Sequence, residues 1–336
     1  MFTTVVVLVV AGLVITSISY RSGGTPKDEG WKPTAMPSRT GGPPLHDFGA
    51  IVPTVTGEFG KRADITLPDA APDGTFAART LIEGTGPVIT DKTYVNVAFT
   101  AKNWTTGASI PGSYDQGGTP HVYQNGVHEV VPAMEDPLVG HRVGSRIVVA
   151  APPAAAFRDA GNKEMKVGPK DTLVFVLDVL DAAPPAGTVQ GQMTPAPADM
   201  PKVTADSANR PLIAVSSQVP APTALKSTVL VKGTGPVLGK NQPVVVQYTG
   251  VLYANGKRFD SSFERGEALG FIMGGQQVIQ GWEDGLIGQT VGSRVELVVP
   301  PALAYKDKAS GDIPPNATLV FVVDILLTGS PVEPVG

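Results

Sequence analysis

Aromatic and aliphatic side chains recur in five separate segments of the last third of the chain, and one carboxylate, Asp260, lies among them. Their spacing supports no Ser-His-Asp arrangement. The chemistry that such a set suits is the binding of an apolar ring, such as that of proline, in a pocket that excludes water. The five segments are Tyr248, residues 259–262, residues 278–282, residues 304–305 and residues 313–321.

At these spacings the five segments closely resemble the FKBP family of macrolide-binding peptidyl-prolyl cis-trans isomerases, over residues 229–327. The resemblance implies catalysis of rotation about the X-Pro bond, which faces a barrier of about 18–20 kcal/mol from lost amide resonance. No bond to nitrogen or oxygen breaks in this reaction, so we expect neither a cofactor nor a metal ion. Twisting reduces charge separation in the amide, and an apolar pocket therefore favours the twisted form.

The same resemblance implies roles for the side chains of the pocket. Trp282 would form the floor, and the Tyr305 hydroxyl would donate a hydrogen bond to a substrate carbonyl. A buried Asp260 would orient polar groups at the rim, paired with Tyr248 or Arg265. These roles make Asp260, Tyr305 and Trp282 the expected catalytic residues. The expected substrate-binding residues are Tyr248, Phe259, Arg265, Leu269, Val278, Ile279, Ile313 and Phe321.

Two features depart from the family pattern. Leu269 stands where the family usually carries an aromatic residue, so one wall of the pocket is less rich in rings. The loop at residues 306–312 is charged and one residue shorter than the common pattern. We therefore expect a changed peptide preference more than a change in activity.

Several strands and one short helix must position these residues. Runs that alternate or are rich in β-branched residues predict strands at 229–231, 244–248, 293–299 and 318–327. Ile279, Trp282 and Leu286 share one face of a helix predicted at 280–287. Asn255-Gly256 predicts a hairpin, because this pair tolerates the positive φ angles of a type I′ turn. The resemblance implies an α+β fold, an antiparallel sheet wrapped around that helix.

The domain occurs twice. The sequence Gly-Thr-Gly-Pro-Val at residues 84–88 recurs at 233–237, and four further segments recur at offsets between 146 and 149. Pro53 and Arg62 likewise match Pro201 and Arg210, so each repeat begins well before its pocket residues. We predict two tandem FKBP-like domains, at residues 53–181 and 201–329. Residues 182–200, rich in Pro and Ala, are the expected linker.

The first repeat keeps the scaffold glycines but loses the polar groups of the pocket. Both hydroxyls and the carboxylate are absent, and a flexible thioether replaces the indole. We expect this domain to be weak or inactive in isomerisation, and still able to bind apolar segments or to space its neighbour from a membrane. The aligned pairs are Tyr248 with Phe99, Phe259 with Ile110, Asp260 with Pro111, Trp282 with Met134, Tyr305 with Phe157 and Phe321 with Phe175.

The first 20 residues carry no charged side chain and are almost continuously apolar at 5–15. This run is short for a membrane span, which needs about 20 apolar residues, and suits the apolar region of a signal peptide. A retained membrane anchor and a buried core segment are the alternatives. Residues 21–52, rich in Gly, Pro, Ser and Thr, are expected to form a disordered stalk. The expected location is extracytoplasmic, either secreted or anchored at the outer face of the membrane.

The composition argues against several classes of partner and of chemistry. The formal net charge is −4 and no basic patch is visible, which argues against a nucleic-acid partner. Cysteine is absent, which excludes disulfides and thiolate chemistry. The four histidines show no metal-ligand spacing, so no metal site is expected.

Two functions follow from these patterns. The first is a peptidyl-prolyl isomerase that assists the folding of exported proteins, active in the second repeat, with prolyl segments as substrates and macrolides as possible ligands. The alternative is a non-catalytic peptide-binding module or holdase chaperone, in which both pockets capture apolar or proline-bearing segments without turnover. The intact Asp260, Trp282 and Tyr305 favour the isomerase.

Overall fold

The computed structural model describes residues 5–10, 13–19, 43–115 and 118–330, the first two ranges by their backbone alone. Two compact units divide this part of the chain, with the change between residues 184 and 185. Within the expected leader, β1 (Val5–Val10) pairs antiparallel with β2 (Leu13–Ser19). The rest of the leader and most of the expected stalk lie outside the described residues. No helix in the described ranges is long and apolar enough to cross a membrane.

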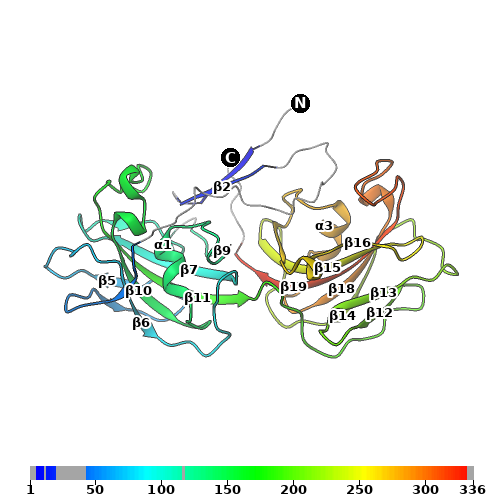
Figure 1. The fold of residues 1–336 in the computed structure, drawn as a ribbon, viewed down its shortest axis with the longest axis horizontal. Helices are drawn as coiled ribbons and strands as arrows, with labels where there is room; N and C mark the ends of the chain where they lie inside the picture. Colours follow the sequence, from blue (N-terminus) through cyan, green and yellow to red (C-terminus); the bar gives the residue numbers. More distant parts are fainter. Residues whose placement is uncertain (1–4, 11–12, 20–42, 116–117, 331–336) are drawn as a thin grey trace. The chain divides into compact units, whose positions relative to one another are not determined.

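The sheet of the second unit contains six strands, all paired antiparallel, in the order β14-β18-β19-β15-β16, with β17 also paired to β15 (Figure 1). The inward side chains of these strands pack with helix α3 in one apolar core. The predicted α+β fold with one principal helix is confirmed here. The elements are β14 (Lys226–Val231), β15 (Pro243–Leu252), β16 (Arg258–Ser261), α2 (Ser262–Arg265), β17 (Leu269–Ile272), α3 (Gln280–Leu286), β18 (Arg294–Val299) and β19 (Leu319–Thr328).

Two glycines allow α3 to lie close to β18. A Cβ atom on Gly281 would lie 2.4 Å from a methyl group of Val299, and one on Gly285 would lie 2.5 Å from a methyl group of Leu297. Real Cβ atoms essentially never come closer than 3 Å, so a larger residue at either position would force the Val299 or Leu297 side chain to shift. The first repeat carries Ala133 in place of Gly281 and the smaller Ala151 in place of Val299.

The helix–strand contact is made by glycine and valine in the second repeat and by two alanines in the first. This difference predicts the outcome of two substitutions. Gly281→Ala is expected to destabilise the second unit by about 1–3 kcal/mol, because the added methyl overpacks the helix–sheet contact. Adding Val299→Ala should recover most of this loss, because it reproduces the pair found in the first repeat. Thermal unfolding of both variants measures the effect. Failure of the second substitution to recover stability would contradict equivalent packing in the two repeats.

The hairpin between β15 and β16 has a different turn from the predicted one. The Gly256 N–H donates to the Leu252 carbonyl at 2.8 Å, and the Leu252 N–H donates to the Lys257 carbonyl at 2.9 Å. Gly256 has a φ of 70°, whereas Asn255 does not take a positive φ. A type I′ turn needs positive φ at both central residues, so the hairpin is confirmed and its turn type was wrong.

The first unit repeats this arrangement around a shorter helix. Its seven-stranded sheet has the order β3-β6-β10-β11-β7-β8, with β9 also paired to β7 and a parallel β3–β6 pair at one edge (Figure 1). Helix α1 (Pro132–Glu135) gives way to a 3₁₀ turn because Pro137 cannot donate the next helical hydrogen bond. The strands are β3 (His46–Asp47), β6 (Ala77–Ile82), β7 (Tyr94–Asn103), β8 (Ser109–Ile110), β9 (His121–Gln124), β10 (Arg146–Ala151) and β11 (Leu173–Ala183).

Residues 185–214 of the second unit, which we call the strap, cover the face of the sheet opposite α3. The strap ends in the hairpin β12 (Lys202–Ala205) and β13 (Pro211–Ala214). Its apolar side chains Met200 and Val203 are buried against outward-facing residues of the sheet such as Val298 and Val322. Residues 185–200, expected to be a linker, are thus part of the packing of the second unit.

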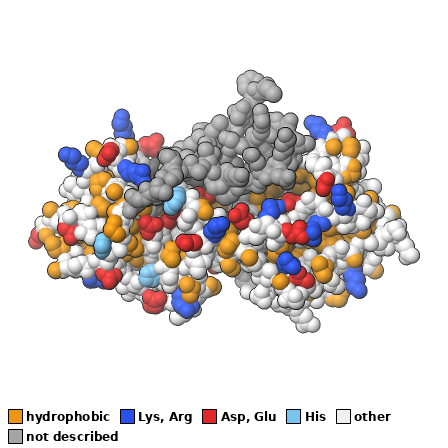
Figure 2. Space-filling view, viewed as in Figure 1, with side chains coloured by type: hydrophobic (Ala, Val, Ile, Leu, Met, Phe, Trp, Pro, Cys, Tyr) orange, Lys and Arg blue, Asp and Glu red, His pale blue; other side chains and the backbone are white. Residues whose placement is uncertain are grey.

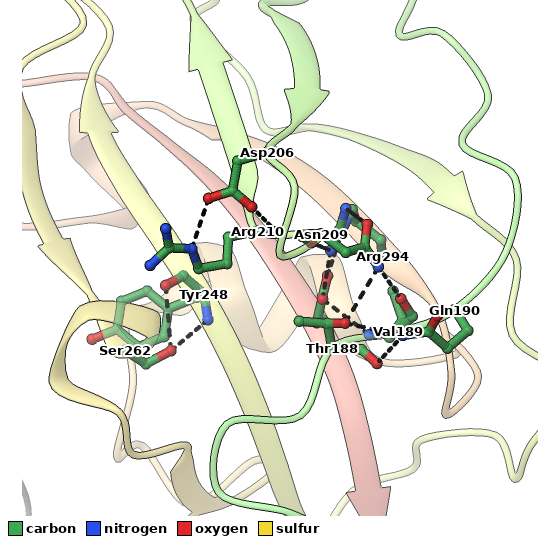
Figure 3. Close-up of polar contacts among 10 residues, drawn as sticks. Thr188, Val189, Gln190, Asp206, Asn209, Arg210, Tyr248, Ser262 and Arg294 are labelled. Carbon is green, nitrogen blue, oxygen red and sulfur yellow. Dashed lines mark hydrogen bonds and ion pairs between the residues drawn. The ribbon is translucent and has the colours of Figure 1, made fainter.

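A buried ion pair ties the strap to the sheet, and its arginine, Arg294, lies beside Asn209 of the strap (Figure 3). The Arg294 guanidinium donates to the Asp324 carboxylate at 2.6 and 2.8 Å, and both side chains are almost fully buried. The same guanidinium donates to the Asn209 carbonyl at 2.7 Å, in the turn between β12 and β13. Asp324 in turn accepts the backbone N–H of Val189 at 3.1 Å. One buried pair therefore holds both ends of the strap.

The first unit contains the same device. Arg146 pairs with Asp178 at 2.6 Å and donates to the carbonyls of Gly57, Glu58 and Lys61 at 2.7–2.8 Å. These carbonyls belong to the turn between β4 (Thr54–Thr56) and β5 (Asp64–Thr66). Each repeat therefore includes an N-terminal hairpin captured by a buried arginine.

One acidic side chain beneath the strap has no counterpart in the first repeat. Glu296 on β18 is fully buried, and neither of its carboxylate oxygens has a hydrogen-bond partner among the described residues. Burial raises the pKa of this carboxyl to about 8. Val148 occupies the same position in β10 of the first repeat.

The raised pKa predicts a pH-dependent stability. Between its ordinary value of 4.5 and about 8, Glu296 keeps its proton when folded and loses it when unfolded. Rising pH therefore favours unfolding across this window, by about 1.4 kcal/mol for each unit. Glu296→Val should remove this slope and raise stability at pH 8. Denaturant unfolding between pH 5 and 9 measures it, and an undiminished slope in Glu296→Val would contradict the assignment to this carboxyl.

Candidate active site

Five aromatic rings, contributed by β15, β16, β17, β19 and α3, meet on the inner face of the sheet. The Trp282 indole contacts Tyr248 and Phe321 edge to face, with ring centroids 5.0 and 5.3 Å apart. Phe259 meets Phe321 at 5.5 Å, also edge to face, and Phe271 lies 6.0 Å from Trp282. Contacts of this geometry are favourable beyond the apolar area that they bury, so the rings form a rigid cluster.

Gly250 makes room for this cluster. A Cβ atom at this position of β15 would lie 2.7 Å from the Phe259 ring and 3.0 Å from the Phe321 ring. The two rings therefore approach each other directly across the strand. The first repeat carries Ala101 in the same register opposite Phe175, which leaves less space for a ring from the neighbouring strand.

Three polar side chains form a connected group at the edge of the cluster. The Tyr248 hydroxyl donates a hydrogen bond to one oxygen of Asp260, and Arg265 forms an ion pair with the other oxygen. Arg265 also donates to the Tyr248 hydroxyl oxygen at 3.1 Å, with its guanidinium 5.5 Å from the centre of the Tyr248 ring. Tyr248, Asp260 and Arg265 are called the rim triad below. The predicted pairing of Asp260 with Tyr248 or Arg265 is thus present with both partners.

The environment of the rim triad differs from the expected one. The Asp260 side chain is 37% exposed, so the expectation that it is buried was wrong. Burial of the phenol and the adjacent Asp260 carboxylate raise the pKa of Tyr248 above its ordinary value. The Tyr248 hydroxyl therefore stays protonated and remains a hydrogen-bond donor across the physiological pH range.

The remaining candidate residues line the same cluster. Trp282 and Ile313 are buried, and the indole N–H of Trp282 has no acceptor among the described residues. The backbone N–H of Ile279, an expected substrate-binding residue, likewise has no acceptor in the described part of the chain. The cluster is completed by partly exposed side chains, namely Leu269, Val278, Ile279, Phe259 and Tyr305.

The sequence analysis missed Phe271 and Gly250 as parts of this site. Phe271 is two residues from Leu269 on β17, and side chains with this spacing point to the same face of a strand. That alternation would have identified it. Phe271 places a ring against Trp282 next to the position where Leu269 lacks one. The need for glycine at position 250 depends on ring contacts between strands, which the sequence does not show.

A family model for FKBP-type peptidyl-prolyl cis-trans isomerases matches residues 86–180 and 235–326, together more than half of the chain. The chain belongs to the FKBP family of peptidyl-prolyl isomerases. Both predicted repeats are matched, so the predicted tandem FKBP-like architecture is confirmed.

Individual relatives align with a stretch of this chain that is about as long as one repeat. An FK506-binding protein of Streptomyces anulatus is 44% identical over 109 residues, which are 32% of this chain and 86% of the relative. FkpA of Escherichia coli K12 is 44% identical over 104 residues, which are 31% of this chain and 37% of that protein. The match thus spans less than two fifths of FkpA.

Two solved structures give weaker global agreement. The crystal structure of Escherichia coli FkpA is 37% identical, with a TM-score of 0.30 over 39% of this chain and 53% of that one. The three FKBP domains of wheat FKBP73 are 20% identical, with a TM-score of 0.32 over 78% of this chain and 98% of that one.

Three pocket positions that are partly exposed in the second repeat are buried in the first. Ile110, Val130 and Val131 are at most 7% exposed, whereas their counterparts Phe259, Val278 and Ile279 are partly exposed. His121 takes the place of Leu269 and packs on Phe99 at 5.5 Å. Burial lowers the pKa of His121 to about 4, so this ring is neutral and serves as core.

The segment that carries Asp260 and Arg265 of the rim triad in the second repeat makes different contacts in the first repeat. Tyr114, near the position of α2, donates its hydroxyl hydrogen to Asp178 at 2.6 Å, the aspartate of the buried pair. Asp115 forms an ion pair with Arg62 of the first repeat's N-terminal hairpin region at 2.7 Å. These polar groups bind the scaffold, and none of them replaces the rim triad.

Charge around both units is mixed. Figure 2 shows Lys and Arg side chains interspersed with Asp and Glu on the face in view. Among the residues that the structure describes, no group of three or more His, Asp or Glu side chains is placed to hold a metal ion.

Proposed function

We propose that the FKBP-type isomerase activity of this chain resides in the second repeat, with Trp282 beneath the substrate proline and Tyr305 and the Ile279 N–H as donors to substrate carbonyls. The observation that carries this proposal is the contrast between the repeats. In the second repeat Phe259, Val278 and Ile279 are partly exposed beside a polar rim, whereas the residues at these three positions in the first repeat are buried in its apolar core.

The proposed mechanism is differential binding of the twisted amide. The rings of Trp282, Phe321 and Phe259 offer an apolar wall, against which the less polar twisted amide is favoured over the planar forms. The rim triad holds Tyr248 in place by a charge-assisted network. Hydrogen-bond donors would hold the substrate carbonyls. One side of the X-Pro bond would then stay fixed while the other side rotates.

The proposed substrates are prolyl segments of unfolded exported proteins, and macrolides are the proposed inhibitors. Export is supported by the uncharged residues 1–20 and their apolar run at 5–15, which suit a secreted protein or one anchored at the outer face of the membrane. The first repeat is proposed to contribute no turnover. A holdase role without catalysis is the competing function.

A double substitution separates the two functions. Asp260→Ala with Tyr305→Phe in the full chain should lower kcat/KM for a prolyl peptide by about tenfold for each hydrogen bond lost, with the circular dichroism spectrum unchanged. Phe157→Leu in the first repeat is the matched control and should leave kcat/KM unchanged. Unchanged turnover in the double variant would contradict the proposed site. Equal suppression of aggregation by the variant and the wild type, without measurable turnover in either, would favour the holdase.

A further inference from the structure

Gln247 is a fully buried amide on β15, adjacent in sequence to Tyr248 of the rim triad. Its register partner on β19 is Asp324, so its side chain lies on the face of the sheet covered by the strap, opposite the aromatic cluster. Both ends of the amide have partners. Its nitrogen donates to the Pro185 carbonyl at 2.5 Å, and its oxygen accepts the Ser262 hydroxyl hydrogen.

Ser262 connects this amide to the pocket. It is the first residue of α2, directly after β16 ends, and its hydroxyl oxygen accepts the Tyr248 backbone N–H at 2.7 Å (Figure 3). The hydroxyl therefore takes the place of a strand partner where the ladder stops. Because Gln247 accepts the hydroxyl hydrogen, the lone pairs of the same oxygen are left to face Tyr248.

The other end of α2 carries the rim. Arg265, the last residue of this four-residue helix, holds Asp260 and the Tyr248 hydroxyl. Tyr248 is thus fixed at both its backbone and its phenol by two residues of α2. The hydrogen bonds run without a break from Pro185, through Gln247 and Ser262, to Tyr248.

The first repeat lacks this connection. Ala98 stands at the position of Gln247, although Ser113 still accepts the Phe99 N–H at 3.0 Å as Ser262 does for Tyr248. Among the described residues of the first repeat, 43–115 and 118–184, no rim triad is present. The buried amide therefore accompanies the polar rim and not the scaffold that both repeats share.

We infer that Gln247 is a positioning residue for the isomerase pocket, coupling the start of the strap at Pro185, where the chain passes between the two units, to Tyr248 and Arg265 through Ser262. This inference rests on the proposed function of the second repeat. It makes the anchoring of residue 185 a determinant of catalysis, although this residue lies on the other face of the sheet.

The test is a double-mutant cycle in the full chain with Gln247→Met, Arg265→Ala and the pair. Met keeps the volume of Gln and removes both hydrogen bonds. Gln247→Met should lower kcat/KM by about three- to tenfold, the effect of one or two neutral hydrogen bonds. The loss should be smaller when Arg265 is already Ala, because both residues act on Tyr248.

Gln242→Ala is the matched control. The side-chain oxygen of Gln242 accepts the backbone N–H of Gly239 at 2.6 Å, whereas that of Gln247 accepts a hydroxyl hydrogen, and Gln242 forms no hydrogen bond with the rim triad. It should alter kcat/KM by less than twofold. Hydrogen exchange of the Tyr248 amide gives a second readout, which can be measured even where turnover is too weak to detect. We expect this exchange to be faster than in the wild type in Gln247→Met and unchanged in Gln242→Ala.

The possible results separate the inference from the proposed function. Independent multiplicative effects of Gln247→Met and Arg265→Ala on kcat/KM, or unchanged Tyr248 amide exchange, would overturn the positioning role. If Arg265→Ala and the Asp260→Ala/Tyr305→Phe variant both leave kcat/KM unchanged, the pocket of the second repeat is not the active site and both proposals fail. If those variants lower kcat/KM and Gln247→Met does not, only the positioning role fails.

Discussion

Replacing Trp282 with Met in the full chain is expected to lower kcat/KM for a prolyl peptide by about 10- to 100-fold, the range for removing a large aromatic anchor. Trp282 contacts Tyr248, Phe271 and Phe321, and a thioether can neither fill this volume nor keep these contacts at fixed geometry. Met is also the residue that the first repeat carries at this position, so the change tests how far the first repeat has diverged.

The matched control is Met134→Leu in the first repeat, where the side chain is fully buried in the core. It should leave kcat/KM unchanged, because the pocket there is closed. Far-UV circular dichroism establishes that Trp282→Met remains folded. A larger loss of activity from Met134→Leu than from Trp282→Met would show that catalysis occurs in the first repeat and would contradict the proposal.

Replacing Arg294 with Met is expected to destabilise the second unit by about 3–5 kcal/mol, because it leaves Asp324 as an unpaired buried charge. The change also removes the hydrogen bond to the Asn209 carbonyl, so the strap loses its attachment in the same step. Differential scanning calorimetry measures it as a fall in Tm of the second unit of about 10 °C.

Two further variants distinguish this effect from a general loss of charge. Arg210→Met breaks the ion pair with Asp206, which is of similar length but partly exposed, and should lower the Tm of the second unit much less than Arg294→Met does. Arg294→Met combined with Asp324→Leu should recover much of the stability, because no unpaired charge remains. If Arg294→Met and Arg210→Met were equally mild, the strap would not depend on the buried pair.

The fold and the apolar part of the site were predictable because they follow from local pattern. The strands at 244–248 and 318–327 are read from alternating and β-branched residues, and the duplication is explicit in the recurring Gly-Thr-Gly-Pro-Val segment. The aromatic cluster followed from a resemblance that rests on ordered segments. The structure brings all of the predicted pocket residues to one place.

What the sequence did not show are interactions between segments far apart in the chain. Residues 185–200 of the strap read as a Pro- and Ala-rich linker, and its packing on the sheet and the buried Arg294–Asp324 pair show that the strap is held there. Glu296 reads as an ordinary polar residue of a strand until the strap covers it. The closure of the first repeat depends on the exposure of side chains, and sequence alignment gives their identity but not their exposure.

We propose that the described residues form one open FKBP pocket and that it lies in the second repeat. Isothermal titration of the full chain with an FKBP-binding macrolide tests it most directly. The account predicts one equivalent bound for each chain, lost in Trp282→Met and retained in Met134→Leu. Two equivalents, binding that survives Trp282→Met, or no binding to the wild-type chain would contradict it.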